Sequence, residues 1–324
     1  MRVRALLLFS LLATPLAQAA QHHLLIISGI GGTDEYREVF ADRATHLYES
    51  AVKAGIDEHN IILLSESGLP DRSRSQRISD KATILQALQE IGARAQLDDR
   101  VFVVLIGHGN ARGDGAAFNL PGPDISAMEL AAALTGLQDQ LVVIINTASS
   151  SGPFIDALSA DKRVVITATS SGREYHATLF GAHFVAAFAE SGADTDKDER
   201  VSMLEAFVFA RRETRRAYDG EKQLLTEHAL LDDNGDGVGS LDPGEFEADG
   251  ALANRVYLQQ PPSLALGASA QLVTMMQRKQ DLEQSIRELK RQREILSRID
   301  YYARLEELLV DLALLSREIR TEGG

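Results

Sequence analysis

A histidine and a run of serines each follow an apolar, strand-like segment of the chain. His108 lies in a Gly-His-Gly sequence directly after the apolar run 101–106, and three serines, residues 149–151, follow soon after the apolar run 141–145. An imidazole at a strand end can act as a general base, and a hydroxyl can be the nucleophile that it deprotonates. The glycines beside His108 favour the close approach of a ligand. If Ser149 works as a nucleophile with His108, the backbone N–H groups of Gly109 and Ser149 are the candidates to hold an oxyanion.

Acidic residues alternate with other residues in the segment 194–205, which has the spacing of a calcium loop. Such a loop of about 12 residues places oxygen ligands at positions one, three, five, seven, nine and twelve. These positions fall on Asp194, Asp196, Asp198, the Arg200 carbonyl, Ser202 and Glu205. Only Glu199 departs from the pattern, because glycine usually occupies the sixth position. The segment predicts a Ca²⁺ site, with an exiting helix that begins at 207–210.

A second acidic cluster has the beginning of a similar loop. Its candidate ligands are Asp232, Asn234 and Asp236. Pro243 occupies the position of the bidentate ligand, so the loop is incomplete unless Asp242 or Glu245 reaches back. Calcium binding and a glycine-rich Asx turn both explain this cluster. The preceding Glu227 and His228 belong to no recognisable catalytic constellation, and we expect them to cap and pack.

Apolar runs alternate with stretches of helical period through the first two thirds of the chain. The expected strands are residues 24–27, 61–64, 101–106, 141–145 and 164–168, and the expected helices are 36–54, 81–95, 128–134 and 179–189. This alternation predicts an α/β fold with a doubly wound, mostly parallel sheet and helices on both faces. Functional loops of such a sheet leave the carboxyl ends of its strands. Residues 29–33, 107–114 and 146–152 should therefore meet at one edge.

The composition excludes several classes of protein. The chain of 324 residues has 33 Lys and Arg against 47 Asp and Glu, which gives a formal net charge of −14. Nucleic-acid binding and attachment to anionic membranes need a basic face, so neither partner is expected. There is no cysteine, which excludes disulfides, thiolate metal sites and a thiol nucleophile.

The chain is expected to divide into four parts. Residues 1–20 combine a basic start, a short apolar run and a small-x-small cleavage pattern, which indicates a secretory signal peptide. The mature protein should be exported to a periplasm or the medium, soluble and without a membrane span. An α/β domain (21–192), an acidic calcium-binding segment (193–262) and a helical tail (263–324) follow.

The tail carries two leucine-rich seams. Apolar residues recur at spacings of three and four within 282–296 and again within 305–319, and the two seams are out of phase. Two structures satisfy this pattern: a helical hairpin that turns near 297–300, with Asp300 as a cap, or one long coiled-coil helix with an irregular repeat. A hairpin would bury the seams within one chain, whereas a continuous helix would need another copy or a groove on the α/β domain, so self-association through 268–320 is one of two open outcomes.

The order of these elements resembles the legumain-like, caspase-fold cysteine peptidases. In that family a His-Gly follows one strand, and an acid-Ala-Cys-x-Ser-Gly segment follows the next. Residues 107–109 match the histidine loop, and Ala-Ser-Ser-Ser-Gly at 148–152 matches the nucleophile loop, with Ser149 where the cysteine stands. The resemblance covers residues 24–189. It implies an endopeptidase fold with peptide or protein partners.

The resemblance also implies a pocket for the residue before the cleaved bond. Tyr36-Arg37 is similar to the pair that follows the first strand in legumain-like enzymes, where the arginine lines this pocket. Residues 167–169 and the following Glu174 resemble the strand end and loop that complete it. Arg37 and Glu174 are therefore the candidate substrate-binding residues.

The serine at position 149 decides the expected mechanism. A thiol of pKa near 8.5 can be held largely as a thiolate beside an imidazole, whereas an alcohol needs a base oriented to take its proton during attack. Because no orienting group is evident around His108, we expect a peptidase homologue that has lost its nucleophile and acts as a calcium-stabilised binding or assembly module. Two alternatives stay open: an active hydrolase that uses Ser149 with His108, and a coiled-coil interaction protein with the α/β domain as its platform.

Overall fold

A computed structural model describes most of the chain. The described residues are 20–66, 77–112, 115–189, 192–198, 200–244, 247–259, 270–293 and 295–322. The expected signal peptide lies outside them except for residue 20, as do Glu199 and Glu245 of the two acidic loops.

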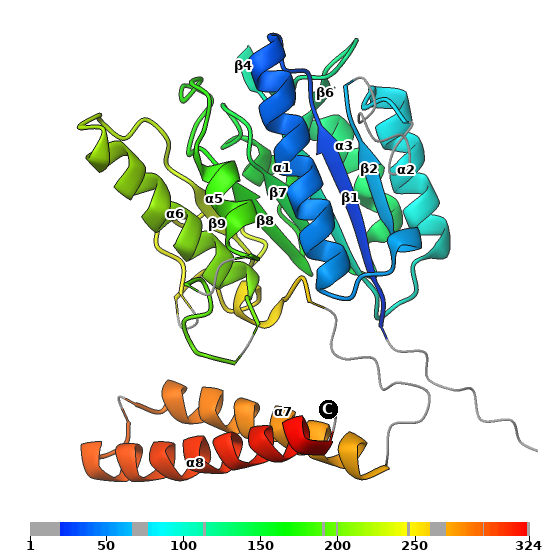
Figure 1. Ribbon diagram of the computed structural model, residues 1–324. Coiled ribbons are helices and arrows are strands. Elements are labelled where there is room, and N and C mark those ends of the chain that lie inside the picture. The colour runs from blue at the N-terminus through cyan, green and yellow to red at the C-terminus, as the bar shows by residue number, and fades with distance from the viewer. Residues whose placement is uncertain are drawn as a thin grey trace, which may run out of the picture.

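A six-stranded sheet with the order β2-β1-β3-β7-β8-β9 forms the centre of the fold (Figure 1). The strands are β1 (His22–Ser28), β2 (Ile61–Leu64), β3 (Arg100–Ile106), β7 (Leu141–Asn146), β8 (Arg163–Thr167) and β9 (Leu230–Asp232). The first five are parallel, and β9 pairs antiparallel with β8. All seven residues of β1 are buried. A parallel sheet covered on both faces buries every strand position, which explains the continuous apolar runs.

Helices cover both faces of this sheet, as the alternation of patterns predicts. On one face lie α1 (Asp34–Lys53), α5 (Phe180–Ala186) and α6 (Met203–Gly220), packed around Leu24 and Ile26. On the other face lie α2 (Lys81–Arg94), α3 (Ala127–Ala133) and α4 (Phe154–Leu158), packed around Leu25 and Ile27. Short 3₁₀ helices complete the fold, at η1 (Glu58–Asn60), η2 (Leu134–Leu137) and η3 (Ala253–Arg255). The result is a mixed α/β fold with a central, mostly parallel sheet.

A small antiparallel sheet follows β3 directly. It consists of β4 (Gly109–Arg112), β5 (Gly115–Phe118) and β6 (Ile125–Ser126). Sequence patterns did not predict these strands, because they are two to four residues long and rich in glycine and alanine. The sheet places the Phe118 ring where a side chain at Gly29 or Gly107 would otherwise lie.

The acidic segment contributes to the same core as the α/β domain. Helix α6 and strand β9 both belong to it, and Phe207, Leu231 and Val256 are buried in the cluster that contains Leu24. The apolar face of α6 has no other surface to cover it, so this segment folds onto the sheet instead of forming a separate unit. Helix α6 begins at Met203, four residues before the expected start.

The tail contains two helices, α7 (Ala270–Arg291) and α8 (Arg298–Glu322), which lie side by side in opposite directions (Figure 1). Asp300 and Ser297 cap the start of α8: the Asp300 N–H donates to Ser297 Oγ at 3.2 Å, and Ser297 Oγ donates to Asp300 Oδ2 at 2.7 Å. Tyr301 and Leu315 are buried between the helices, whereas Val310 remains 52% exposed. None of the described helices is long and apolar enough to cross a membrane.

Candidate functional site

The loops that leave β1, β3 and β7 meet at the carboxyl edge of the sheet, as predicted. The Gly29 N–H donates to the Ile106 carbonyl at 2.9 Å, and the Thr147 N–H donates to the Leu105 carbonyl at the same distance. A Cβ added to Gly109 would lie 2.4 Å from the Ser149 carbonyl oxygen. The loop that carries the histidine therefore approaches the serine loop so closely that only glycine fits at 109.

The Ser149 hydroxyl is bonded to the backbone of Gly109. It accepts from the Gly109 N–H at 3.2 Å and donates to the Gly109 carbonyl at 3.1 Å. Ser149 is 2% exposed, and no hydrogen bond joins it to His108 in the described part of the chain. The N–H expected to hold an oxyanion thus donates to the expected nucleophile.

The His108 ring lies among aromatic side chains of α1. Its centroid is 4.6 Å from that of Tyr36 and 4.9 Å from that of Phe40, both at steep interplanar angles. Burial, together with the positive charge of Arg43, lowers the pKa of His108 below its usual value of 6.5. The imidazole is therefore neutral at pH 7 and able to accept a proton. Among the described residues, no carboxylate hydrogen bonds to the ring to orient it.

The two serines after Ser149 hold the loop in place. Ser150 has a positive φ of 54°, and its N–H donates to the Glu174 carbonyl at 2.8 Å. Ser151 Oγ and Thr169 Oγ1 are 3.1 Å apart. Each of the two serines is 1% exposed. Their hydroxyls serve structural roles and do not face solvent.

The structure does not bring Arg37 and Glu174 into contact. Arg37 pairs with Asp34 and lies 3.4 Å from a carboxylate oxygen of Glu66. Glu174 instead accepts from the Nδ1 of His228 at 2.8 Å. Each of the two candidate pocket residues is thus engaged by other groups. Asp34 is a neighbour of Arg37 on α1, whereas Glu66 and His228 come from distant segments that local sequence patterns do not connect.

Glu227 caps the first turn of α5, in agreement with the capping role predicted for it. Its two carboxylate oxygens accept from the N–H groups of Leu179 and Phe180 at 2.8 and 3.1 Å. Burial raises the pKa of Glu227. The carboxylate stabilises a helix N-terminus.

The first acidic loop gathers three of its expected ligands. Asp194, Asp196 and Asp198 each offer a carboxylate oxygen, and these oxygens lie within 4.8 Å of one another. Asp196 is exposed, but desolvation of its carboxylate within the loop, with the neighbouring charges of Asp198 and Glu205, raises the pKa of Asp196 to about 6. Oxygen-only donors at this separation suit a hard cation such as Ca²⁺.

Glu205 and Ser202 form the N-terminal cap of α6. Glu205 Oε2 accepts from the N–H and the hydroxyl of Ser202, both at 2.9 Å, and its Oε1 accepts from the Thr195 N–H at 2.8 Å. Glu205 thus links the exit helix to the loop that holds the three aspartates. The capping arrangement explains why α6 begins earlier than its apolar periodicity indicates.

The second acidic cluster is a tight turn around Asp232. The two carboxylate oxygens of Asp232 accept from the N–H groups of Gly235 and Gly237 at 3.2 and 3.1 Å. Asp242, one of the two residues considered to complete this loop, instead pairs with Arg211 on α6 at 2.8 Å. The Asp242 carboxylate is thus engaged by α6.

Asp249 is a further acid beside this turn that the sequence did not single out. It accepts from the Asp233 N–H at 3.2 Å and is 2% exposed. Burial and the nearby charges of Asp232 and Asp233 raise the pKa of Asp249 to about 6. No local spacing connects it to the loop, because the chain returns to the turn only in the folded protein.

Comparisons with known proteins match part of the chain to a peptidase family. Residues 78–227 match the model of the Peptidase C13 family, a range that includes both His108 and Ser149. A search of curated proteins gave no match. The crystal structure of protein GSU0716 from Geobacter sulfurreducens is similar at a TM-score of 0.42 with 10% sequence identity, over 60% of this chain and 89% of that one. The resemblance to legumain-like peptidases is therefore confirmed by the match of residues 78–227 to the Peptidase C13 family.

Proposed function

We propose that this protein is a degenerate member of its peptidase family, exported and stabilised by calcium, which binds peptide or protein partners instead of cleaving them. The observation that carries the proposal is the state of Ser149, which stands where the resemblance places the catalytic cysteine. Its hydroxyl is almost fully buried, and the backbone of Gly109 engages it both as acceptor and as donor.

The energetics of attack support the loss of catalysis. A hydroxyl becomes a nucleophile when a base within hydrogen-bond reach removes its proton. Ser149 donates to a carbonyl, whereas the His108 ring packs between Tyr36 and Phe40. An attack would need to break both bonds to Gly109, including the one that occupies the oxyanion donor, before any chemistry begins.

One observation favours an active serine hydrolase as the second candidate function. The lowered pKa of His108 keeps its imidazole neutral at pH 7, which is the protonation state that a general base needs. A shift of the Ser149 side chain toward His108 would then produce a catalytic pair, with the Gly109 N–H released for the oxyanion.

The calcium part of the proposal rests on Asp194, Asp196 and Asp198. Three carboxylates this close repel one another, and a bound divalent cation would neutralise them. Sites of extracellular type bind as weakly as about millimolar Kd. Such a site would still be filled after export. Glu205 would hold the loop against α6.

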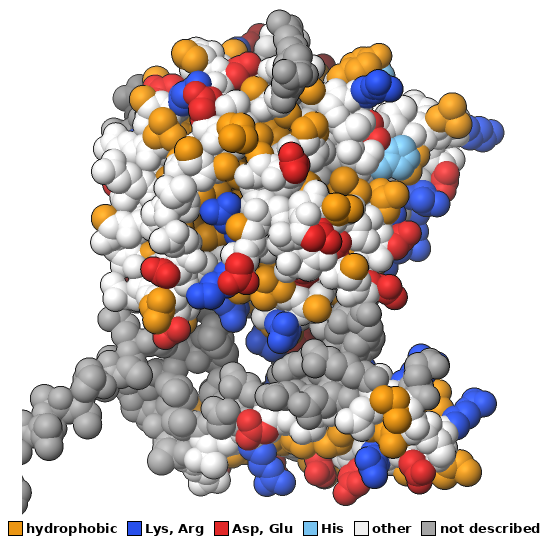
Figure 2. All heavy atoms as spheres, turned by 180° about the vertical axis from the view of Figure 1, so that it is seen from behind, with side chains coloured by type: hydrophobic (Ala, Val, Ile, Leu, Met, Phe, Trp, Pro, Cys, Tyr) orange, Lys and Arg blue, Asp and Glu red, His pale blue; other side chains and the backbone are white. Residues whose placement is uncertain are grey.

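The charge distribution and the tail support a protein partner. On the face opposite to that of Figure 1, Lys and Arg side chains are interspersed with Asp and Glu side chains in the described part of the molecule (Figure 2). The tail helix α8 exposes Leu309, Val310 and Leu314 at 48, 52 and 55%. We propose that this apolar stripe mediates self-association.

Covalent labelling separates the two candidate functions. The purified protein is treated with a fluorophosphonate probe, with and without calcium, beside the Ser149→Ala and His108→Ala variants. We expect no label on any of them. Label that appears on the unmodified chain and disappears in both variants would instead establish the active hydrolase.

A further inference from the structure

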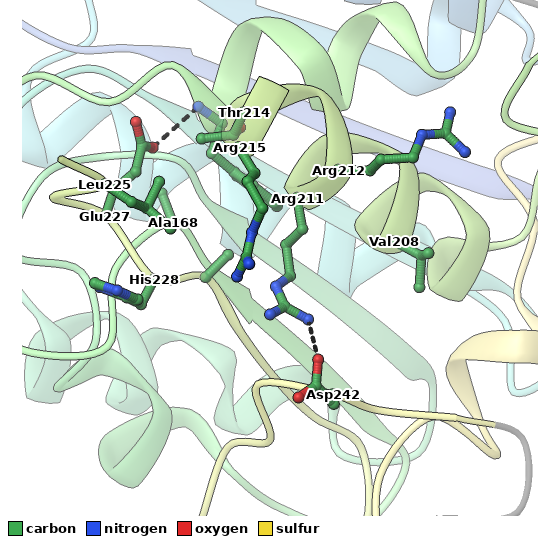
Figure 3. A pocket seen from close by; sticks show the side chains of 12 residues that line it. Ala168, Val208, Arg211, Arg212, Thr214, Arg215, Leu225, Glu227, His228 and Asp242 are labelled. Carbon is green, nitrogen blue, oxygen red and sulfur yellow. Dashed lines mark hydrogen bonds and ion pairs between the residues drawn. The ribbon is translucent and has the colours of Figure 1, made fainter. Parts of the chain in front are cut away.

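A cavity of about 560 Å³ lies between α6 and the end of β8 (Figure 3). Its volume is within the range of ligand-binding pockets, roughly 300–1,000 Å³. Phe180, Val208 and Leu225 give it an apolar wall. The catalytic-loop residues Ser149 and His108 do not line it, so it is distinct from the candidate acyl-transfer site.

Two arginines of α6 extend toward this cavity from positions one helical turn apart (Figure 3). Arg211 pairs at 2.8 Å with Asp242, a rim residue whose side chain is 89% exposed. Arg215 makes no hydrogen bond or ion pair with any residue that the structure describes. The cavity therefore holds a cation without a direct partner, in a chain whose formal net charge is −14.

The other acidic group of the cavity is already engaged. Both oxygens of Glu227 accept from N–H groups at the start of α5. His228 likewise donates to Glu174, outside the cavity lining. Neither residue makes a hydrogen bond or an ion pair with Arg215 in the part of the chain that the structure describes.

A buried hydroxyl provides an independent indication of a ligand. Thr214 lines the cavity and is 3% exposed, and its Oγ1 has no hydrogen-bond partner. Buried polar groups are nearly always paired, and leaving one unpaired is costly. Thr214 precedes Arg215 on α6, so a hydroxyl donor and a cation adjoin in the same wall.

We propose that this cavity binds a carboxylate carried by a peptide, with an adjoining apolar residue of that peptide against Phe180 and Leu225. Arg215 and Arg211 would supply the positive charge, and Thr214 the hydroxyl donor. A carboxylate is favoured over a phosphate because the rim carboxylate of Asp242 repels a dianion more than a monoanion. The inference rests on the proposed peptide-binding function and names the class of peptide.

The position of the cavity agrees with this proposal. Its lining includes Ala168, which directly precedes Thr169, and Thr169 holds the serine loop through Ser151. A peptide that crosses the carboxyl edge of the sheet could therefore extend its acidic residue into the cavity.

The test is calorimetric titration of the full chain with three short peptides. The peptide Ac-Leu-Asp-Leu-NH₂ carries a side-chain carboxylate, and Leu-Asn-Leu carries a C-terminal carboxylate. The blocked peptide Ac-Leu-Asn-Leu-NH₂ carries neither. We expect at least one acidic peptide to bind at least about tenfold more tightly than the blocked Asn peptide, a difference of about 1.4 kcal/mol. The stronger of the two acidic peptides identifies the source of the carboxylate.

Variants of α6 locate the binding. Arg215→Gln should weaken binding of the acidic peptide about tenfold or more. Arg216→Gln is the control, because it makes the same charge change at a residue that pairs with Glu213 outside the cavity, and it should leave peptide binding intact. Thr214→Val should weaken binding without lowering Tm, because the hydroxyl that it removes has no partner in the free protein.

Four results would overturn the proposal. Equal binding of the acidic and blocked Asn peptides removes the carboxylate preference, while peptide binding itself stands. If Arg215→Gln and Arg216→Gln lose the same peptide affinity, the cavity is not the binding site. If inorganic phosphate displaces the peptide at a concentration below that of the peptide, the cavity is a phosphate site. Absence of binding by all three peptides would overturn the peptide-binding function as well.

Discussion

The distances in the first acidic loop allow the effect of Asp196→Asn on stability to be estimated. Asp194, Asp196 and Asp198 hold carboxylate oxygens within 4.8 Å of one another. Two unit charges about 4–5 Å apart repel by roughly 1 kcal/mol in water. Asp196→Asn removes two of the three repulsions, so the calcium-free protein should gain about 1–2 kcal/mol, or about 2–8 °C in Tm for a domain of this size.

Calcium should raise the Tm of the unmodified protein much more than the Tm of the Asp196→Asn variant. A cation that binds only the folded chain adds about 2.7 kcal/mol at one hundred times its Kd, which is about 5–10 °C in Tm. The unmodified protein should show this rise, and the Asp196→Asn variant should lose most of it. Asp196 is a better position for the test than Glu205, whose carboxylate also caps α6 through Ser202.

The same site has a defined pH dependence. Because the pKa of Asp196 is raised to about 6 in the calcium-free fold, protons compete with calcium as the pH falls through that value. Protonation of a group whose pKa is raised by folding also stabilises the folded chain. The calcium-induced rise in Tm should therefore shrink between pH 7 and pH 5, while the calcium-free Tm gains a contribution from Asp196.

Differential scanning calorimetry of both proteins, with calcium, with magnesium and with a chelator, provides the measurement. Asp139→Asn serves as the matched control, because Asp139 is exposed and its carboxylate makes no hydrogen bond or ion pair with the residues that the structure describes. A calcium-free Tm that does not rise in Asp196→Asn, together with an undiminished calcium shift, would refute the repulsion argument and the site.

Three further predictions follow from other parts of the molecule. Ser149→Cys should cleave Asn, Asp or Arg reporter peptides at least about tenfold faster than the unmodified chain, since a thiolate needs no oriented base; inactivity on all three would show that the peptide pocket has decayed. Burial lowers the pKa of His22 to about 4, so between about pH 6.5 and pH 4 His22 is protonated in the unfolded chain but neutral in the folded one. Stability should fall by at most about 3 kcal/mol as the pH drops from about 6.5 to about 4, and urea titrations should show a smaller fall in His22→Gln. Removal of residues 263–324 should convert a dimer into a monomer in light scattering, whereas a monomer in both forms would exclude self-association through the tail.

The parts of the fold that the sequence determined are those with a local physical signature. Five buried parallel strands carry continuous apolar runs, and the structure places a strand on each of them. The convergence of the loops after β1, β3 and β7 follows from the parallel arrangement itself. The alternating acids of 194–198 likewise lie together because the residues that share a tight loop are close in the chain.

The groups that each side chain contacts depend on how distant segments come together in the fold. The commitment of the Ser149 hydroxyl to Gly109 depends on a loop that is 40 residues away in the chain. The pairing of Asp242 with Arg211 and the unpartnered hydroxyl of Thr214 depend on how α6 packs beside the last strand. Local patterns report burial and backbone conformation, whereas hydrogen bonds between distant segments arise only when the sheet brings those segments together.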